Sequence, residues 1–327
     1  MNSRERFLET MNFGSLDRVP LFEEGIRDEV MKTWRSQGLS IGQELTDLFI
    51  YDRREEIEPE LDPIPYPRHW PESIAELPGL KKRLKVDDPR RLPENLQAPL
   101  RTISERNWPL FLRVHRGFFL SMGVEGWGRF TKVMELLVDD PDFVHASLAL
   151  QGEFAARMAE MILEQIQVDG AIFSEPIGGN HGPLVSPKMY ETFVLNSYQP
   201  LFEILRQFDV KIIILRTYAN ARLLLPVAVK AGFNCLWAHE CSMPAMDYRI
   251  LRAEFGRDLR LIGGIDTNVL RQGKDAIRCE LEEKVPELLA MGGYVPLANS
   301  RVREEIPFEN YVYYRRMLEN LVLQAKQ

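Results

Sequence analysis

The sequence predicts an α/β fold with a parallel sheet, and three observations favour a (β/α)8 barrel. Short apolar strands alternate with longer helical segments over most of the 327 residues. Residues 210–215 form a nearly continuous apolar run, as expected for a parallel strand that is covered on both faces. The length suits one barrel domain, because such barrels often exceed about 250 residues. The regular succession of strands and helices fits a closed barrel better than an open sheet.

The alternation defines the expected elements in order. The predicted strands are residues 18–22, 110–114, 170–173, 211–215, 234–237, 260–265 and 294–298. The predicted helices are residues 134–165, 187–207, 221–231, 246–255 and 275–291. The clearest part is the end of this series, where a strand, a helix of 3.6-residue period and a second strand form a βαβ pattern. Gly292 and Gly293 follow that helix, at the place where a left-handed residue commonly ends a helix.

Residues 50–107 interrupt the alternation. They are rich in proline and charge, but they also contain Tyr66, Trp70 and several leucines, so their composition is not of low complexity. We predict an excursion with proline-set turns that packs against the barrel, rather than a flexible linker. The expected organisation is therefore a single domain over residues 1–327.

The composition excludes several classes of function. Hydrophobic residues make up 45% and charged residues 27%, which is typical of a soluble protein with a large core. The net charge of −7 argues against general nucleic-acid binding, and no apolar run approaches the roughly 20 residues of a membrane span. Residues 1–14 are charged and amphipathic, unlike a secretory signal. The three cysteines have no CxxC spacing, which fits a reducing compartment. We expect a cytoplasmic protein without nucleic-acid or membrane partners.

Several motifs together resemble the uroporphyrinogen decarboxylase (URO-D) superfamily. They are MNSRERFLETMNFGSLDRVP at the start, SEPIGGNHGPLVSPKMYETFVLNSYQPLFEIL in the middle, and GGIDTNVL and GGYVP…IPFEN near the end. Each motif is weak alone, but the set covers nearly the whole chain. The resemblance implies a cytoplasmic TIM barrel with one of two chemistries, decarboxylation or cobamide-linked methyl transfer. These motifs resemble the methyltransferase-like branch more closely than the authentic uroporphyrinogen decarboxylases.

The chain departs from the signatures of both chemistries. The decarboxylases carry an R-Q-A-G-R loop after the first strand, where this chain reads FEEGIRDEV and keeps only Arg27 as a cation. The methyltransferases activate a thiol on zinc through a His-x-Cys motif and a later Cys, where this chain has Arg216, Tyr218 and Ser300. Other relatives read HSDGN at the first place, of which Asn220 remains. The resemblance therefore predicts the fold together with an altered active site.

Polar side chains follow most of the predicted strands. In barrel enzymes the catalytic groups lie at the carboxyl ends of the strands and on the loops that follow. The candidates at this mouth of the barrel are Glu23, Glu24 and Arg27; His115 and Arg116; Glu175, Asn180 and His181; Arg216 and Tyr218; His239, Glu240 and Cys241; Asp266; and Asn299, Ser300 and Arg301. Their convergence predicts an enzyme. The arginines indicate an anionic small-molecule substrate, because a positive mouth on an acidic protein focuses the field on anions.

Glu175, Glu240 and Tyr218 are the predicted catalytic residues. Glu175 ends an apolar strand, so partial burial would raise the pKa of its carboxyl toward the range for proton transfer. Tyr218 can donate a hydrogen bond to an oxyanion or act as an acid. Arg216 stays protonated, so we expect it to bind a substrate carboxylate or phosphate. The structural alternative is an ion pair of Arg216 with Glu175 or Glu240.

The remaining strand-end residues are predicted to bind the substrate. They are His181, Asn180, His115, Arg116, Asp266, Arg301, Ser300 and Arg27. His181 has glycines nearby on both sides, which would let substrate or backbone approach closely.

His239 and Cys241 are a candidate metal pair. In an extended segment both side chains point to the same side, spaced as two zinc ligands. Further ligands would come from His115, His181 or Glu175. The alternative is a packed cysteine, in which case Glu240 alone serves as acid, base or substrate anchor.

Three functions follow from these patterns, with methyl transfer first. A methylated (methoxy) anionic donor would pass its methyl group to a corrinoid or thiol acceptor. The second function is cofactor-free decarboxylation of a tetrapyrrole or aromatic carboxylate, with Arg216, Glu175 and Tyr218 as the working residues. The third is a barrel that has lost catalysis and binds a corrinoid or tetrapyrrole. A corrinoid protein and a second copy of the chain are the macromolecular partners that we consider, and zinc is the metal.

Overall fold

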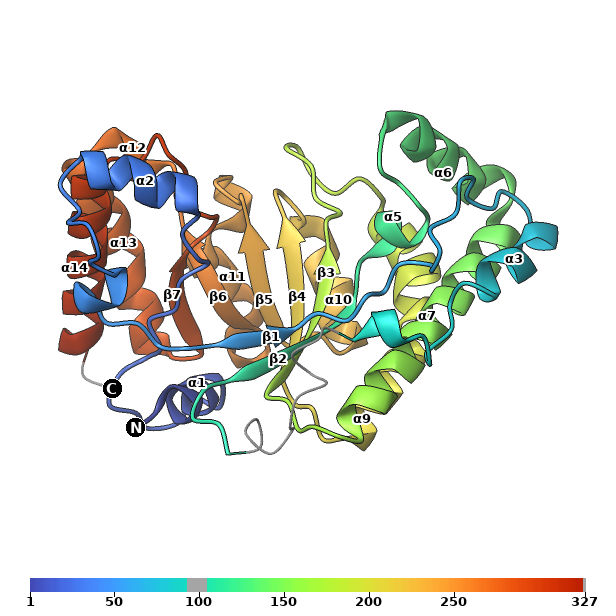
Figure 1. The fold of residues 1–327 in the computed structure, drawn as a ribbon, viewed down its shortest axis with the longest axis horizontal. Helices are drawn as coiled ribbons and strands as arrows, with labels where there is room; N and C mark the ends of the chain where they lie inside the picture. The colour runs from blue at the N-terminus through green and yellow to red at the C-terminus, as the bar shows by residue number, and fades with distance from the viewer. Residues whose placement is uncertain (93–104, 326–327) are drawn as a thin grey trace. The chain divides into compact units, whose positions relative to one another are not determined.

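A computed structural model describes residues 1–92 and 105–325, and the chain divides into two compact units. Unit 1 comprises Met1–Arg54, Asn107–Pro109 and Cys235–Gln327, and unit 2 comprises Glu55–Arg106 and Leu110–Asn234. In each unit, strands alternate with helices along the chain (Figure 1). The α/β class predicted from the sequence is therefore confirmed, whereas the expectation of a single domain stays a prediction.

Unit 1 contains three strands, of which the middle one pairs in parallel with both neighbours. The strands are β5 (Cys235–His239), β6 (Arg260–Ile265) and β7 (Tyr294–Ala298). The helices are α1 (Ser3–Met11), α2 (Asp28–Ser36), α11 (Tyr248–Phe255), α12 (Val269–Gln272), α13 (Lys274–Met291) and α14 (Phe308–Gln324), with 3-10 turns at Leu45–Asp47, Pro244–Met246 and Gly256–Asp258. The predicted strands at 260–265 and 294–298 have their predicted bounds.

The predicted βαβ pattern is the unit β6–α13–β7. Helix α13 ends at Met291, and Gly292 and Gly293 then adopt φ values of 71° and 62°. Left-handed backbone of this kind favours glycine. A Cβ on Gly293 would also collide with the ring of Phe13. Conformation and space together therefore require the second glycine.

The predicted strand at residues 18–22 is wrong, because these residues are in no strand. Hydrogen bonds with Asp52 hold this segment in place of the backbone hydrogen bonds between paired strands. The Asp52 carboxylate accepts the N–H of Leu21 at 2.8 Å and pairs with Arg18 at 2.5 Å, while the Asp52 N–H donates to the Leu21 carbonyl at 2.9 Å. The apolar segment is thus held by a buried side chain of unit 1.

The described residues of unit 2 contain four strands that pair in parallel in chain order. The strands are β1 (Glu55–Ile57), β2 (Leu110–His115), β3 (Gly170–Glu175) and β4 (Ile213–Tyr218). The helices are α3 (Leu77–Lys81), α5 (Phe118–Ser121), α6 (Trp127–Asp139), α7 (Pro141–Leu163), α8 (Pro187–Met189), a π-helix (Tyr190–Leu195), α9 (Gln199–Gln207) and α10 (Leu225–Ala231), with 3-10 turns at Ile74–Glu76, Pro89–Arg91 and Arg222–Leu224.

Two predicted helices of unit 2 are divided. The segment 134–165 contains parts of α6 and α7, because the Asp140 side chain caps a new helix by accepting the Phe143 N–H at 3.1 Å, and Pro141 occupies its first turn. The segment 187–207 contains α8, the π-helix and α9 in succession.

The segment 50–107 contains one strand that was not predicted from the sequence. Strand β1 is only three residues long and includes Glu55 and Glu56, so it has no apolar run that predicts a strand. It pairs in parallel with the beginning of β2. The part of the segment at residues 93–104 lies outside the described residues.

Among the residues that the structure describes, no helix is both long and apolar enough to cross a membrane.

Candidate functional site

The carboxyl ends of β5, β6 and β7 lead to one polar cavity in unit 1, which we name the strand-end cavity. Its volume is about 180 Å³. It is lined by Glu240, Ser242, Thr267, Asn268, Arg271, Asn299, Ser300, Arg303, Glu305 and Ile306. Hydroxyl, amide, carboxylate and guanidinium groups from three successive strand ends therefore meet here, as in barrel enzymes.

Glu240 has the most unusual backbone at this cavity. Its φ is 49°, a left-handed conformation that is uncommon for a residue other than glycine. The Glu240 N–H donates to the carbonyl of Asn299 at 2.8 Å, which ties the end of β5 to the end of β7. The side chain is 55% exposed and pairs with Arg303 at 3.0 Å. An accessible carboxylate is thus fixed beside a guanidinium, and such backbone strain clusters at active sites.

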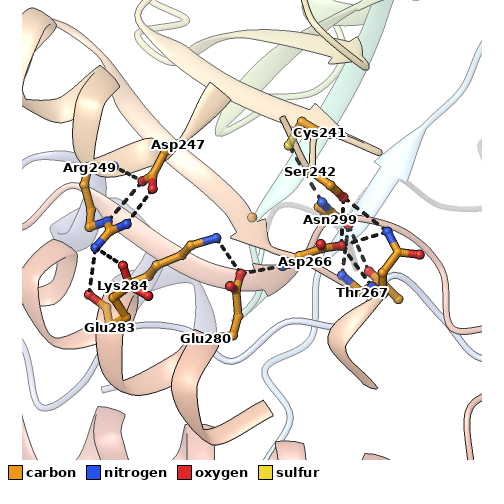
Figure 2. Close-up of polar contacts among 12 residues, drawn as sticks. Cys241, Ser242, Asp247, Arg249, Asp266, Thr267, Glu280, Glu283, Lys284 and Asn299 are labelled. Carbon is orange, nitrogen blue, oxygen red and sulfur yellow. Dashed lines mark hydrogen bonds and ion pairs between the residues drawn. The ribbon is translucent and has the colours of Figure 1, made fainter. Parts of the chain in front are cut away.

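Asp266 holds the loop after β6 and does not line the strand-end cavity. One of its carboxylate oxygens accepts the Ser242 hydroxyl at 2.8 Å and the Asn268 N–H at 2.9 Å. Its own N–H donates to Glu280 at 2.9 Å, and Lys284 contacts the same Glu280 oxygen at 2.7 Å (Figure 2). The substrate-binding role predicted for Asp266 is not supported by this position.

Thr267, Asn299 and Ser300 form a second set of contacts at the cavity. The side-chain oxygen of Asn299 accepts the Thr267 hydroxyl at 3.0 Å and the Thr267 N–H at 3.2 Å (Figure 2). The N–H of Ser300 donates to the Thr267 hydroxyl at 3.0 Å. Ser300, the position where relatives carry a ligand, therefore lies at the cavity with its backbone fixed.

The predicted metal pair, His239 and Cys241, lacks the geometry of a zinc site. The left-handed conformation of Glu240 breaks the extended segment on which the prediction depended. The Cys241 thiol is buried and donates to the Ala238 carbonyl at 3.4 Å. His239 is stacked on Trp237 with ring centroids 5.7 Å apart. In the described part of the chain, no cluster of three or more His, Cys, Asp or Glu residues could hold a metal.

Glu175 and His115 lie in a buried cluster of unit 2. The Glu175 side chain is completely buried and accepts hydrogen bonds from the Phe118 N–H, at 2.9 Å, and from the Tyr198 hydroxyl. Burial raises the pKa of Glu175 to about 7 and lowers the pKa of His115 to about 3. The His115 ring lies 4.4 Å from the Tyr198 ring, centroid to centroid. Both side chains are buried, and the role predicted for these two residues at the mouth stays a prediction.

Arg216 pairs with Glu56, so the alternative of an ion pair with Glu175 is wrong. In the register of β3 and β4, Arg216 is opposite Ser174, while Glu175 is opposite Thr217. Side chains alternate along a strand, so Arg216 and Glu175 point to opposite faces of the sheet. Two guanidinium nitrogens of Arg216 donate to the Glu56 carboxylate at 2.9 and 2.5 Å. Burial and charge pairing leave Arg216 fixed on the face that it shares with Tyr218.

Tyr218, Asn180 and His181 lie on exposed parts of unit 2. Tyr218 ends β4 and is 37% exposed. Asn180 and His181 are exposed in the loop after β3, where Gly179 forms a bridge with Asn220 after β4. The loops after these two strands therefore meet, as the sequence predicts for strand ends.

The predicted arginines are distributed over different surroundings. Arg116 forms an ion pair with Asp62 and lines a cavity of about 400 Å³ in unit 2. Arg27 precedes α2, and its mostly exposed side chain lies 3.6 Å from Glu29. Arg301 is exposed and does not line the strand-end cavity. Arg27 therefore belongs to the surface of unit 1 rather than to a site.

Sequence reasoning missed seven of the ten residues that line the strand-end cavity. The missed residues are Ser242, Thr267, Asn268, Arg271, Arg303, Glu305 and Ile306. Arg303 stands two residues after the predicted Arg301, in a loop whose path no periodic pattern predicts. Polar residues directly after the β6 motif GGID were the available signal for Thr267 and Asn268.

Parallel strands whose carboxyl ends carry polar side chains are the architecture of TIM-barrel-type enzymes. The sequence model of the uroporphyrinogen decarboxylase (URO-D) family matches residues 118–309, more than half of the chain. The chain therefore belongs to the uroporphyrinogen decarboxylase family and has its TIM-barrel-like fold. Members of this superfamily are generally enzymes. A comparison with curated proteins gives no match.

Proposed function

We propose that this protein is an enzyme of the URO-D superfamily that binds a small methylated anion at the strand-end cavity and transfers its methyl group to a corrinoid or thiol acceptor. The observation that carries the proposal is Glu240, an accessible carboxylate held at φ 49° and paired with Arg303. A substrate carboxylate that binds Arg303 would replace Glu240 in this ion pair. Glu240 would then face the substrate instead of the guanidinium.

The chemistry assigned to Glu240 is protonation of the leaving oxygen. In this O-demethylation the acceptor nucleophile forms a bond to the methyl carbon, and the C–O bond of the methoxy group breaks. The electron pair stays on oxygen, which takes a proton that the Glu240 carboxylate takes up from solvent after the substrate has displaced it from Arg303, because an alkoxide without an acid or a Lewis acid is a poor leaving group. Glu175 is unsuited to this step, since it is completely buried. The geometry of His239 and Cys241 does not fit zinc, so no step is assigned to a metal.

The acceptor belongs to a second molecule in this proposal. The reaction needs either a reduced corrinoid, carried by a partner protein or supplied as a free cofactor, or a thiol. In either case the acceptor enters as a substrate, and the chain supplies anion binding and a proton. The net result is a demethylated anion and a methylated acceptor, which are two products that can be measured independently.

The test is an anaerobic assay with the full chain, 3-methoxybenzoate as donor, and cob(I)alamin or a thiol as acceptor. The expected result is formation of methylcobalamin or a thioether together with 3-hydroxybenzoate. Glu240→Gln should remove most of this activity, whereas Glu304→Gln, which changes an exposed glutamate that does not line the cavity, should keep it. Binding of methoxylated acids without turnover in the presence of both acceptors would refute methyl transfer and support the non-catalytic binding barrel.

A cofactor-free decarboxylation is the second candidate, and one observation favours it. Arg216 and Tyr218 project from the same face of β4, with Arg216 held by Glu56. A guanidinium that orients a carboxylate and a phenol that protonates a ring carbon are the two groups such a reaction needs. Release of CO₂ from aromatic or tetrapyrrole carboxylates without added acceptor, abolished in Tyr218→Phe, would favour this reaction over methyl transfer.

A further inference from the structure

The turn between β2 and α5 is packed directly against the end of β3. Strand β2 ends at His115 and α5 begins at Phe118, so the turn consists of Arg116 and Gly117. Gly117 has φ 93°, and a Cβ at this position would lie 2.5 Å from the Ser174 carbonyl oxygen and 3.0 Å from a carboxylate oxygen of Glu175. The turn can approach β3 this closely only because Gly117 has no side chain.

Two buried side chains satisfy the backbone donors of this turn. The Gly117 N–H donates to Nδ1 of His115 at 2.9 Å, and the Phe118 N–H donates to Oε1 of Glu175 at 2.9 Å. The other oxygen of Glu175 accepts the Tyr198 hydroxyl. Glu175 therefore bridges the turn after β2 and the helical segment that follows β3.

Buried side chains surround the Glu175 carboxyl. The titratable groups that face it are His115, Tyr190 and Tyr198, all fully or almost fully buried. Thr217 is opposite Glu175 in the register of β3 and β4 and is also completely buried. The hydroxyls of Tyr190 and Thr217 have no hydrogen-bond partner among the described residues. A substrate would have to dismantle this cluster to reach the carboxyl.

Arg116 is the residue of the turn that faces a cavity. Its guanidinium pairs with Asp62, and the cavity of about 400 Å³ is also lined by Arg90, Arg91 and Arg113 and by the carboxylates of Glu58, Glu60 and Asp62. Arg116 is bonded directly to Gly117, so the direction of its side chain depends on the backbone that Glu175 holds. We propose that Glu175 is a positioning residue, which fixes the turn between β2 and α5 and thereby aims Arg116 into this cavity as a binding group for an anion.

This inference goes beyond the proposed function and does not depend on it. Its test requires no substrate. Phenylglyoxal labels accessible arginines, and peptide mass spectrometry reads each site separately. Arg116, which is largely buried, should label slowly in the native chain, and the exposed Arg90 provides the internal control. Hydrogen exchange of the peptide that contains Phe118 measures the turn itself in the same sample.

Two variants of Glu175 test the positioning role, because one shortens the side chain and the other removes its charge. Glu175→Asp keeps the charge but withdraws the carboxylate from the Phe118 N–H. Labelling of Arg116 and exchange of the turn should both rise roughly tenfold, the factor that corresponds to loss of one hydrogen bond to a buried donor. Glu175→Gln keeps an acceptor oxygen at the same reach and should restore both rates to within about threefold of the native chain. Arg90 labelling should stay constant in all variants.

Thr217→Val is the matched control, since it changes the same cluster at a hydroxyl that does not contact the turn. It should leave Arg116 labelling unchanged. Equal labelling and exchange in Glu175→Asp and the native chain would overturn the positioning role. A rise in Thr217→Val equal to that in Glu175→Asp would also overturn it, because any disturbance of the cluster would then suffice. Neither result depends on the methyl-transfer assay, so failure of one proposal leaves the other testable.

Discussion

Removal of the Glu175 carboxyl should change how the stability of the protein depends on pH. Burial raises the pKa of Glu175 from 4.5 to about 7 in the folded chain. The folded state therefore holds this proton more tightly than the unfolded state does. The resulting stability is fully present below pH 4.5 and is lost as the pH rises through about 7.

The size of this effect follows from the two pKa values. A change from 4.5 to about 7 corresponds to about 3 kcal/mol of unfolding free energy, taking 1.36 kcal/mol for each pH unit. His115 acts in the opposite direction, because burial lowers its pKa to about 3. The stability due to His115 is present above its ordinary pKa of 6.5 and is lost as the pH falls toward 3. The raw pH profile therefore contains two opposing contributions.

A comparison of the native chain with Glu175→Gln isolates the glutamate, because His115 is present in both. Urea unfolding at pH 4.5, 6, 7 and 8 gives the free energy of each protein by linear extrapolation. The native chain should lose up to about 3 kcal/mol relative to the variant between the lowest and highest pH. Glu304→Gln, measured in parallel, controls for the substitution at an exposed site. A native-minus-variant difference that stays constant over this range would refute the buried, proton-binding carboxyl.

Three further results are expected. Gly293→Ala should lower the unfolding free energy by roughly 2 kcal/mol in urea titrations, because φ is 62° and the new methyl group collides with Phe13; an unchanged midpoint would contradict this close approach. Asp52→Ala should lower the unfolding free energy by about 3 kcal/mol or more, because Arg18 loses its buried ion-pair partner. A melting temperature equal to that of the native chain would exclude this stabilising role of Asp52. Elemental analysis after incubation with zinc should find well below one zinc per chain, given the packed Cys241 thiol. Stoichiometric binding that is lost in Cys241→Ser would show that Cys241 is a zinc ligand.

The fold could be predicted where apolar runs are bounded by glycines and regular helices. Strands β6 and β7 meet this condition, and their bounds were predicted correctly. Strand β1 could not be predicted, because two of its three residues are glutamates and its pairing with β2 is set by tertiary contacts. The segment 18–22 has the composition of a strand, but the buried Asp52 provides hydrogen bonds that no local pattern reveals.

The site was harder to predict, because a strand assignment does not determine which face its last residue occupies. Glu175 was expected at the mouth, yet the register of β3 and β4 places it on the face opposite Arg216. A register shift between Arg113 and His115 similarly alters the face on which the end of β2 presents its side chains. Glu240 could be identified from its place after β5, although its left-handed backbone could not. The residue type at a strand end therefore predicts candidate site residues, and the register of strand pairing determines which of them share a face of the sheet.

The Glu56 carboxylate, which is held on the short strand β1, competes with any other anion for binding to Arg216. Any anion that approaches this guanidinium must displace a carboxylate that already accepts two hydrogen bonds from it and is tethered to the same sheet. A tethered ligand acts at an effective concentration in the millimolar range or higher, so a monodentate ion such as chloride gains little by exchange. A planar ligand with two oxygens in carboxylate spacing reproduces both hydrogen bonds. If Arg216 binds an anion, Glu56 would weaken the binding of all anions and favour bidentate ones.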